Sequence, residues 1–221
     1  MVQPLRLFNC GSRWVFISGL VFVALLAGQF VEAAGREQLV PILAVKAGQK
    51  PMGTVAYLMV AFEERHDDTG LIIHFGDKPG RFSPLARISV DQAVRRTARS
   101  LGLNTDSWTV QLSVPYPGVT IYGESLSAMI GLSVAALAQG EFILPDRAIT
   151  GTITADGRIG PVGSVPLKIA AAGDAHLQRV LVPEDRDPGD GEYPLPFLMQ
   201  ITTVKSVMQA YAALLAPVSR R

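Results

Sequence analysis

Two serines follow a glycine at a point where a strand is predicted to give way to a helix. Ser125 and Ser127 lie in the segment IYGESLSAMIG, two and four residues after Gly123. A serine at the start of a helix usually caps it, because the hydroxyl accepts a hydrogen bond from a free backbone N–H group. The same position suits a nucleophile, because unpaired N–H groups and the positive end of the helix dipole stabilise an oxyanion. Both interpretations are open on these residues alone.

A lysine on a short apolar helix is the second unusual feature. Lys168 is the only polar residue in the run PLKIAAA, residues 166–172. A lysine in such a run usually extends its amine to solvent along its apolar stem. If the amine is instead buried, its pKa falls from about 10.4 by about 3 units, which makes it a general base near neutral pH. Such a base activates a serine hydroxyl as a nucleophile.

Composition excludes several other kinds of chemistry. The 221 residues include one cysteine, Cys10, so zinc ribbons, iron–sulfur sites and disulfide scaffolds are excluded. The three histidines, His66, His74 and His176, have no metal-binding spacing, and no Gly-rich phosphate loop ending in Gly-Lys-Ser/Thr is present. With a formal charge of +1, the chain lacks the basic excess of a nucleic-acid-binding protein. We therefore expect no metal, no cofactor and no nucleic-acid partner.

The first 34 residues are typical of a targeting segment rather than of a folded domain. Arg6 and Arg13 precede an uncharged run over residues 14–27, and small residues follow at Ala33 and Ala34. This order predicts a secretory signal peptide. If the apolar run is extended through Val31, an uncleaved apolar membrane-anchoring helix is the alternative. Either outcome exports the remaining chain, residues 35–221, to the periplasm or the extracellular space, or leaves it anchored on the outer side of a membrane.

Residues 35–221 predict one α+β domain with mixed sheets and about four helices. Strands and helices are interspersed without regular alternation. An Asp156-Gly157 turn between two alternating arms predicts a hairpin. The expected strands are 39–47, 53–64, 71–76, 108–118, both arms of 148–163, 179–183 and 197–204, and the expected helices are 84–101, 126–139, 166–173 and 205–215.

The first of these helices has clear boundaries. Ser83 is a predicted cap, Pro84 occupies the first helical position, and Gly102 ends the helix. Its arginines are interpreted as a solvated face, with a basic docking patch as the alternative. The buried stripe is expected to consist of Leu85, Ile88, Val94, Ala98 and Leu101.

Three segments together resemble the proteolytic domain of Lon-type serine peptidases, without the ATPase part. They are GESLSAMIGLSVAALAQG, DRAITGTITADGRIGPVGSVPLKIAAA and RVLVPED, and the likeness extends over most of residues 50–215. In that family a G-x-S motif opens a helix, and a T-G-x-(I/L) stretch leads to a lysine. The resemblance therefore implies a Ser–Lys dyad on the Lon proteolytic-domain fold.

The roles carry over residue by residue. Ser125 lies 43 residues before Lys168, as the family's nucleophile lies before its base, whereas Ser127 lies 41 residues before it. Ser125 thus resembles the nucleophile and Lys168 the base. Thr150 matches a threonine that helps to hold the lysine, while Gly123 and Ser127 support the serine loop. Leu126 departs from the family pattern, which has alanine there.

The resemblance implies an ATP-independent serine endopeptidase that acts on unfolded or flexible polypeptides outside the cytoplasm. Lon proteins fuse this domain to an ATP-driven unfoldase, and nothing in this chain is expected to bind ATP. The alternative is a weakly active or inactive Lon-like module that binds peptides or assembles on a membrane, favoured by the bulk of Leu126. Expected partners are polypeptide substrates, with membrane association through residues 14–31 and homo-oligomer formation left open.

Overall fold

The structure, a computed structural model, describes residues 36–192 and 198–216. The signal peptide or anchor expected over residues 1–34, with its apolar helix, lies outside these residues. Within the described ranges, no helix is both long enough and apolar enough to cross a membrane.

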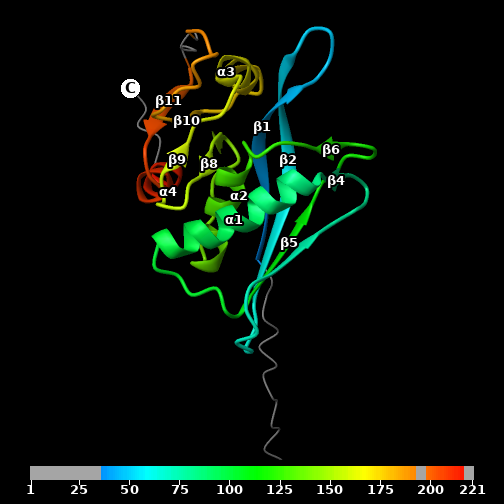
Figure 1. Ribbon diagram of the computed structural model, residues 1–221, viewed down its shortest axis with the longest axis vertical. Coiled ribbons are helices and arrows are strands. Elements are labelled where there is room, and N and C mark those ends of the chain that lie inside the picture. Colours follow the sequence, from blue (N-terminus) through cyan, green and yellow to red (C-terminus); the bar gives the residue numbers. More distant parts are fainter. Residues whose placement is uncertain (1–35, 193–197, 217–221) are drawn as a thin grey trace, which may run out of the picture. The chain divides into compact units, whose positions relative to one another are not determined.

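Strands and helices follow each other in the mixed order expected of an α+β protein, and the four predicted helices are all present (Figure 1). The elements are β1 (Arg36–Lys46), β2 (Met52–Glu64), β3 (Ile72–Phe75), β4 (Arg81–Phe82), α1 (Pro84–Ser100), β5 (Trp108–Ser113), β6 (Thr120–Ile121), α2 (Ser127–Ala138), β7 (Arg147–Ile149), β8 (Thr152–Ile153), β9 (Ile159–Gly160), α3 (Val165–Asp174), β10 (Arg179–Pro183), β11 (Gln200–Val204) and α4 (Val207–Leu215).

The larger sheet has the strand order β1-β2-β5-β3. Strands β1 and β2 form a long antiparallel hairpin, β5 continues the antiparallel pairing, and β3 joins β5 in parallel. One face of this sheet contributes Val40, Leu58, Val60, Val110 and Leu112 to the main hydrophobic core. Helices α1 and α2 complete that core, since their buried residues belong to the same cluster.

Helix α2 lies at the centre of the core. Every residue from Ser127 to Leu137 is buried. The helix is apolar on all sides, as expected of a helix that has no face exposed to solvent. It packs closely on α1: the two helices approach so closely at Gly131 that an added Cβ would lie 2.6 Å from Thr97 Oγ1. The N-terminus of α2, which follows the serine loop, is therefore fixed by the core itself.

The buried face predicted for α1 is partly wrong. Leu85 and Ile88 are 54% and 57% exposed. The physical reason is that α2 approaches α1 closely at Ala93 and Thr97, so the face of α1 with these shorter side chains is the one that is buried, and Leu85 and Ile88 lie outside it. Ser83 caps the helix as predicted, with its hydroxyl accepting from the amide of Ala86 at 3.2 Å. The face that is buried consists of Ala86, Val90, Ala93, Val94, Thr97 and Ala98.

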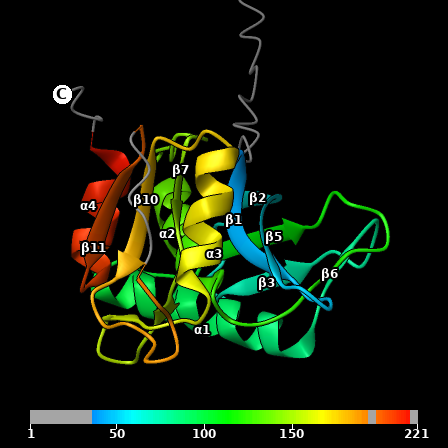
Figure 2. The same ribbon diagram turned by 90° about the horizontal axis from the view of Figure 1, so that it is seen from above.

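A second, parallel sheet has the order β11-β10-β7. Helix α3 lies between this sheet and the β1–β2 hairpin, as Figure 2 shows. Its apolar side joins Leu43 of β1 and Val180 of β10 in a smaller hydrophobic cluster. Helix α3 is thus packed on both sheets, and this arrangement positions Lys168.

The hairpin predicted over residues 148–163 is confirmed at its turn but is shorter than expected. Strands β8 and β9 pair antiparallel for two residues each. The backbone of Gly157 has φ +78°, in the left-handed region that glycine adopts without strain. Only the first two residues of the predicted first arm, Ala148 and Ile149, belong instead to β7, which pairs with β10.

Candidate active site

Ser125 lies in the loop between β6 and α2, half-buried, and lines a cleft of about 790 Å³. The N-cap residue of α2 is Leu126, which makes no side-chain capping hydrogen bond. The capping interpretation is therefore wrong for both serines. Ser127 is the first helical residue and is only 1% exposed, so the two serines have different surroundings. Ser125 lines the cleft, and Ser127 is buried in the interior.

The bulk of Leu126 does not obstruct the cleft. Its side chain is 3% exposed and packs in the main hydrophobic core, and Leu126 is not among the residues that line the cleft. The leucine that departs from the family pattern therefore fills space in the interior. The bulk of Leu126 therefore does not favour an inactive module.

Lys168 does not extend its amine to solvent, so that interpretation is also wrong. The residue is 4% exposed, and its Nζ donates a hydrogen bond to Thr150 Oγ1 at 3.2 Å. Burial lowers the pKa of Lys168 from 10.5 to about 8, and the carboxylate of Asp190 opposes this by favouring the charged amine. With this pKa roughly a tenth of the amines is neutral at pH 7, where an ordinary lysine is almost entirely charged.

Thr150 joins the lysine to the serine loop. Its side chain is fully buried, and its hydroxyl accepts from Lys168 Nζ and donates to the carbonyl oxygen of Ser125 at 3.5 Å. The amide of Gly151 donates to the same carbonyl at 3.0 Å, and Ala128 donates back to Gly151 at 3.1 Å. Ser125, Thr150 and Lys168 are thus brought together. Among the described residues the serine and lysine side chains share no direct hydrogen bond in this structure.

Backbone amides with no acceptor lie beside the serine. Gly123 has φ +81°, a left-handed conformation that lets the chain turn sharply before Ser125. The amides of Ser127 and Ala128 are used within the loop and by Gly151. Within residues 36–192 and 198–216, the N–H groups of Ser125 and Leu126 have no hydrogen-bond acceptor. These two groups are available to an oxyanion.

Sequence reasoning missed Asp190, which holds the N-terminus of α3. Its two carboxylate oxygens accept from the amides of Ser164 at 2.7 Å and Val165 at 2.9 Å. Ser164 has φ +60°, so Asp190 stabilises a backbone conformation that a serine rarely adopts. Asp190 is one of several acids in the loop 184–196, and nothing in its sequence context distinguishes it from the others.

Gly53 was also missed, although a glycine inside a predicted strand is a signal of close backbone approach. A Cβ at this position would lie 1.9 Å from the carbonyl oxygen of Leu167 and 3.0 Å from the side chain of Ala171. Strand β2 therefore contacts the backbone of α3 directly, beside Lys168. Gly53 and Asp190 together determine where the lysine lies.

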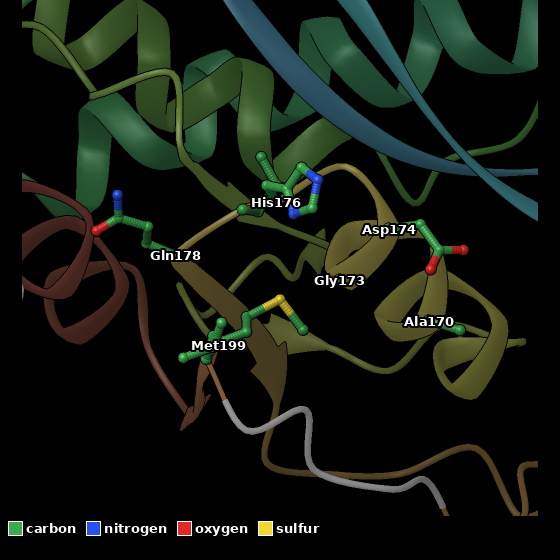
Figure 3. A pocket seen from close by; sticks show the side chains of 8 residues that line it. Ala170, Gly173, Asp174, His176, Gln178 and Met199 are labelled. Carbon is green, nitrogen blue, oxygen red and sulfur yellow. The ribbon is translucent and has the colours of Figure 1, made fainter.

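A second hollow, of about 720 Å³, lies at the C-terminal end of α3 (Figure 3). Asp174 and His176 lie on one side of it, and Met199 lies on the side of the segment that leads into β11. Neither Ser125, Thr150 nor Lys168 lines this hollow. Of the three residues only Ser125 lines the first cleft, whereas Thr150 and Lys168 are buried. Because that cleft contains the candidate nucleophile, it is the candidate active site.

A serine in an open cleft, linked through a threonine to a buried lysine, defines a candidate hydrolase site of the serine–lysine class. The chain matches the family model of the Lon protease (S16) C-terminal proteolytic domain over residues 84–216, which is more than half of its length. The chain belongs to this family.

Individual relatives agree with the family match. A Lon protease from Syntrophomonas wolfei is 33% identical over 114 residues, which cover 50% of this chain and 14% of the relative. The peroxisomal Lon protease homolog 2 of Danio rerio is 28% identical over 160 residues, covering 70% of this chain and 19% of the relative. The corresponding protein of Xenopus laevis is 36% identical over 90 residues, covering 41% of this chain and 10% of the relative. The chain thus spans less than a fifth of the length of these relatives.

Proposed function

We propose that this protein is an ATP-independent serine endopeptidase with a Ser125–Lys168 dyad, acting on unfolded or flexible polypeptides outside the cytoplasm. The observation that carries the proposal is the amine of Lys168, buried, with a lowered pKa, and hydrogen-bonded to the threonine that also contacts Ser125. Membership of the Lon proteolytic-domain family supports the same reaction class.

The proposed reaction has two steps. Neutral Lys168 accepts the proton of Ser125 as Oγ attacks a peptide carbonyl, and the amides of Ser125 and Leu126 stabilise the oxyanion. The protonated amine then gives this proton to the leaving nitrogen, the C–N bond breaks, and an ester remains on Ser125. In the second step Lys168 takes a proton from water, the hydroxide attacks the ester, and Ser125 is released with its proton restored.

Two features of the sequence support ATP independence and export. The chain contains no Gly-rich phosphate loop ending in Gly-Lys-Ser/Thr. Residues 1–34 have the order of a targeting segment, which would place the domain where ATP is scarce. The proposed substrates are segments that are already extended and therefore need no unfolding.

Hydrolysis of unfolded casein by the purified protein tests this function. We expect cleavage without nucleotide, the same rate with ATP and magnesium, and no cleavage of a tightly folded control protein. Dependence of the rate on ATP would contradict ATP independence. If casein is bound but not cut, the protein is a peptide-binding module rather than a peptidase.

The cleavage rate is expected to increase with pH up to about 8 and then level off. Only the neutral amine of Lys168 accepts a proton, and the pKa of this amine is about 8. Asp190→Asn removes a carboxylate that favours the charged amine, so the pKa should fall and the rising limb should move to lower pH. The comparison is the pH dependence of kcat/KM for wild type, Asp190→Asn and Asp187→Asn. If the rising part of the pH profile is unchanged in Asp190→Asn, or shifts equally in both variants, the role of Asp190 in setting the pKa of Lys168 is refuted.

Replacing Gly53 by alanine is expected to displace α3 and its lysine. The added Cβ would overlap the carbonyl of Leu167, and the neighbouring atom is backbone that has little freedom to move. We expect a loss of about 2 kcal/mol in the free energy of unfolding and a kcat about ten- to a hundredfold lower. Gly48→Ala is the matched control, since its Cβ would lie 3.9 Å from the nearest atom. Equal activity of the two variants would show that the contact does not position Lys168.

A further inference from the structure

The cleft that contains Ser125 is predominantly apolar. Its apolar lining includes Val45, Val55, Val119 and Ile121. Among the described residues that line it, Lys46 alone carries a charge. An apolar substrate side chain fits this cleft at the bond to be cut, and no lining carboxylate attracts a basic one.

A neighbouring hollow of about 430 Å³ shares a wall with this cleft. Thr120 and Tyr122 line both spaces, and Tyr122 is 74% exposed. Thr120 in β6 and Tyr122 directly after it flank Ile121, which is 7% exposed, so their side chains point away from the core side that Ile121 occupies. They therefore form a ridge between the serine cleft and the second space.

Arg81 lines the second space but not the serine cleft, so it lies beyond this ridge. It is the partner of Thr120 in the parallel pairing of β4 with β6, and its Nε donates to Thr120 Oγ1 at 3.1 Å. That bond fixes the stem of the side chain and leaves both terminal nitrogens of the guanidinium without a described partner. Such a fork binds a carboxylate through two parallel hydrogen bonds.

The charge of Arg87, the other arginine that lines this hollow, is already neutralised by a neighbouring carboxylate. Arg87 forms an ion pair with Asp77, donates to the carbonyl of Phe82, and lies over the ring of Phe75. No described carboxylate lies within ion-pair distance of Arg81. The hollow thus has one uncompensated positive charge, and that charge is on the side of the ridge opposite the candidate nucleophile.

The distance from Ser125 to the ridge at Tyr122 fits a single extended substrate polypeptide that occupies both spaces. Tyr122 precedes Ser125 by three positions, which bounds the distance between their Cα atoms at about 10 Å. An extended chain advances about 3.3 Å per residue. A substrate that crosses the ridge would therefore present to Arg81 a side chain about two to four residues from the bond being cut.

We infer that Arg81 is a specificity-determining residue that binds an aspartate or glutamate side chain of the substrate. This inference rests on the proposed peptidase function. The preferred substrate is a polypeptide with an apolar residue at the bond to be cut and an acidic residue two to four positions away.

Paired fluorogenic peptides test the inference with the full protein. Each pair has the same apolar centre and differs only by Glu or Gln at one of four positions on either side of it. We expect one position at which Glu raises kcat/KM about tenfold over Gln. Arg81→Gln should reduce this ratio to about one, and Arg81→Glu should favour Lys over Glu at that position. Arg95→Gln, which alters an exposed arginine paired with Asp91 on α1, should leave the ratio as in wild type.

The outcomes separate the two proposals. If the wild type cleaves no peptide of either kind, the peptidase function fails and the inference fails with it. If peptides are cut but Glu and Gln are equivalent at every position, the function holds and the inference is refuted. A preference for Glu that survives Arg81→Gln but disappears in Lys46→Gln assigns the selectivity to the cleft itself and also refutes it.

Discussion

Replacing Lys168 by methionine is expected to lower casein hydrolysis at least about a thousandfold and, at the same time, to stabilise the fold. Methionine has a similar length and fills the same buried space without a proton-accepting amine. The depressed pKa of Lys168 means that the folded protein disfavours the charged amine. A shift from 10.5 to about 8 corresponds to a cost of about 3 kcal/mol, so the variant should be more stable at pH 7 by about 1–3 kcal/mol.

The gain in stability of Lys168→Met over wild type is expected to depend on pH. Below pH 8 the amine is charged in both the folded and the unfolded chain, so the folded state bears the full cost. The cost decreases as the pH rises from about 8 towards 10.5, because the folded protein loses its proton first. Chemical denaturation at pH 7 and at pH 10 measures the difference. Lys205→Met is the control, since Lys205 is an exposed lysine. Equal stability changes at both pH values, or an active Lys168→Met variant, would contradict the assignment.

Ser125→Ala is expected to reduce hydrolysis by at least about a thousandfold without unfolding the protein. The described contacts of Ser125 with Thr150 and Gly151 are made by its backbone carbonyl, and alanine keeps that carbonyl. The circular dichroism spectrum and the melting temperature should therefore remain close to those of wild type. The rate of casein cleavage is the measured quantity.

Ser127→Ala is the matched control for this experiment. Ser127 is buried and does not line the cleft, so its replacement should change the rate by less than about threefold. Loss of activity in Ser127→Ala together with full activity in Ser125→Ala would show that the nucleophile has been placed two residues too early.

Ser125, Thr150 and Lys168 could be predicted because each lies in a short sequence pattern that can be recognised without the fold. Ser125 lies where a strand gives way to a helix, and Lys168 is the only polar residue in an apolar run. The family spacing then distinguished Ser125 from Ser127, and Thr150 came with the same motif. Thr150 contacts both the backbone carbonyl of Ser125 and the amine of Lys168, so the structure brings the three residues together, and their catalytic roles stay predictions.

The residues that position Lys168 were not predictable from local patterns. The role of Asp190 depends on a loop that returns to the start of α3, 26 residues away from Ser164. The role of Gly53 depends on contact between β2 and α3, which are far apart in the chain. Periodicity also misled for α1, since Leu85 and Ile88 have helical spacing, but the close approach of α2 selected the face with small residues.

The site at which an electrophile acylates the protein tests directly whether Ser125 is the nucleophile. A β-lactone is opened by the attacking hydroxyl, so the adduct remains as an ester and adds the whole mass of the lactone. Fragmentation mass spectrometry of the digested protein then identifies the modified serine. We predict an adduct on Ser125 in the wild type and at least about a hundredfold slower labelling in Lys168→Met. Labelling of Ser127 or of another serine, or labelling of Ser125 at the same rate in both proteins, would contradict it.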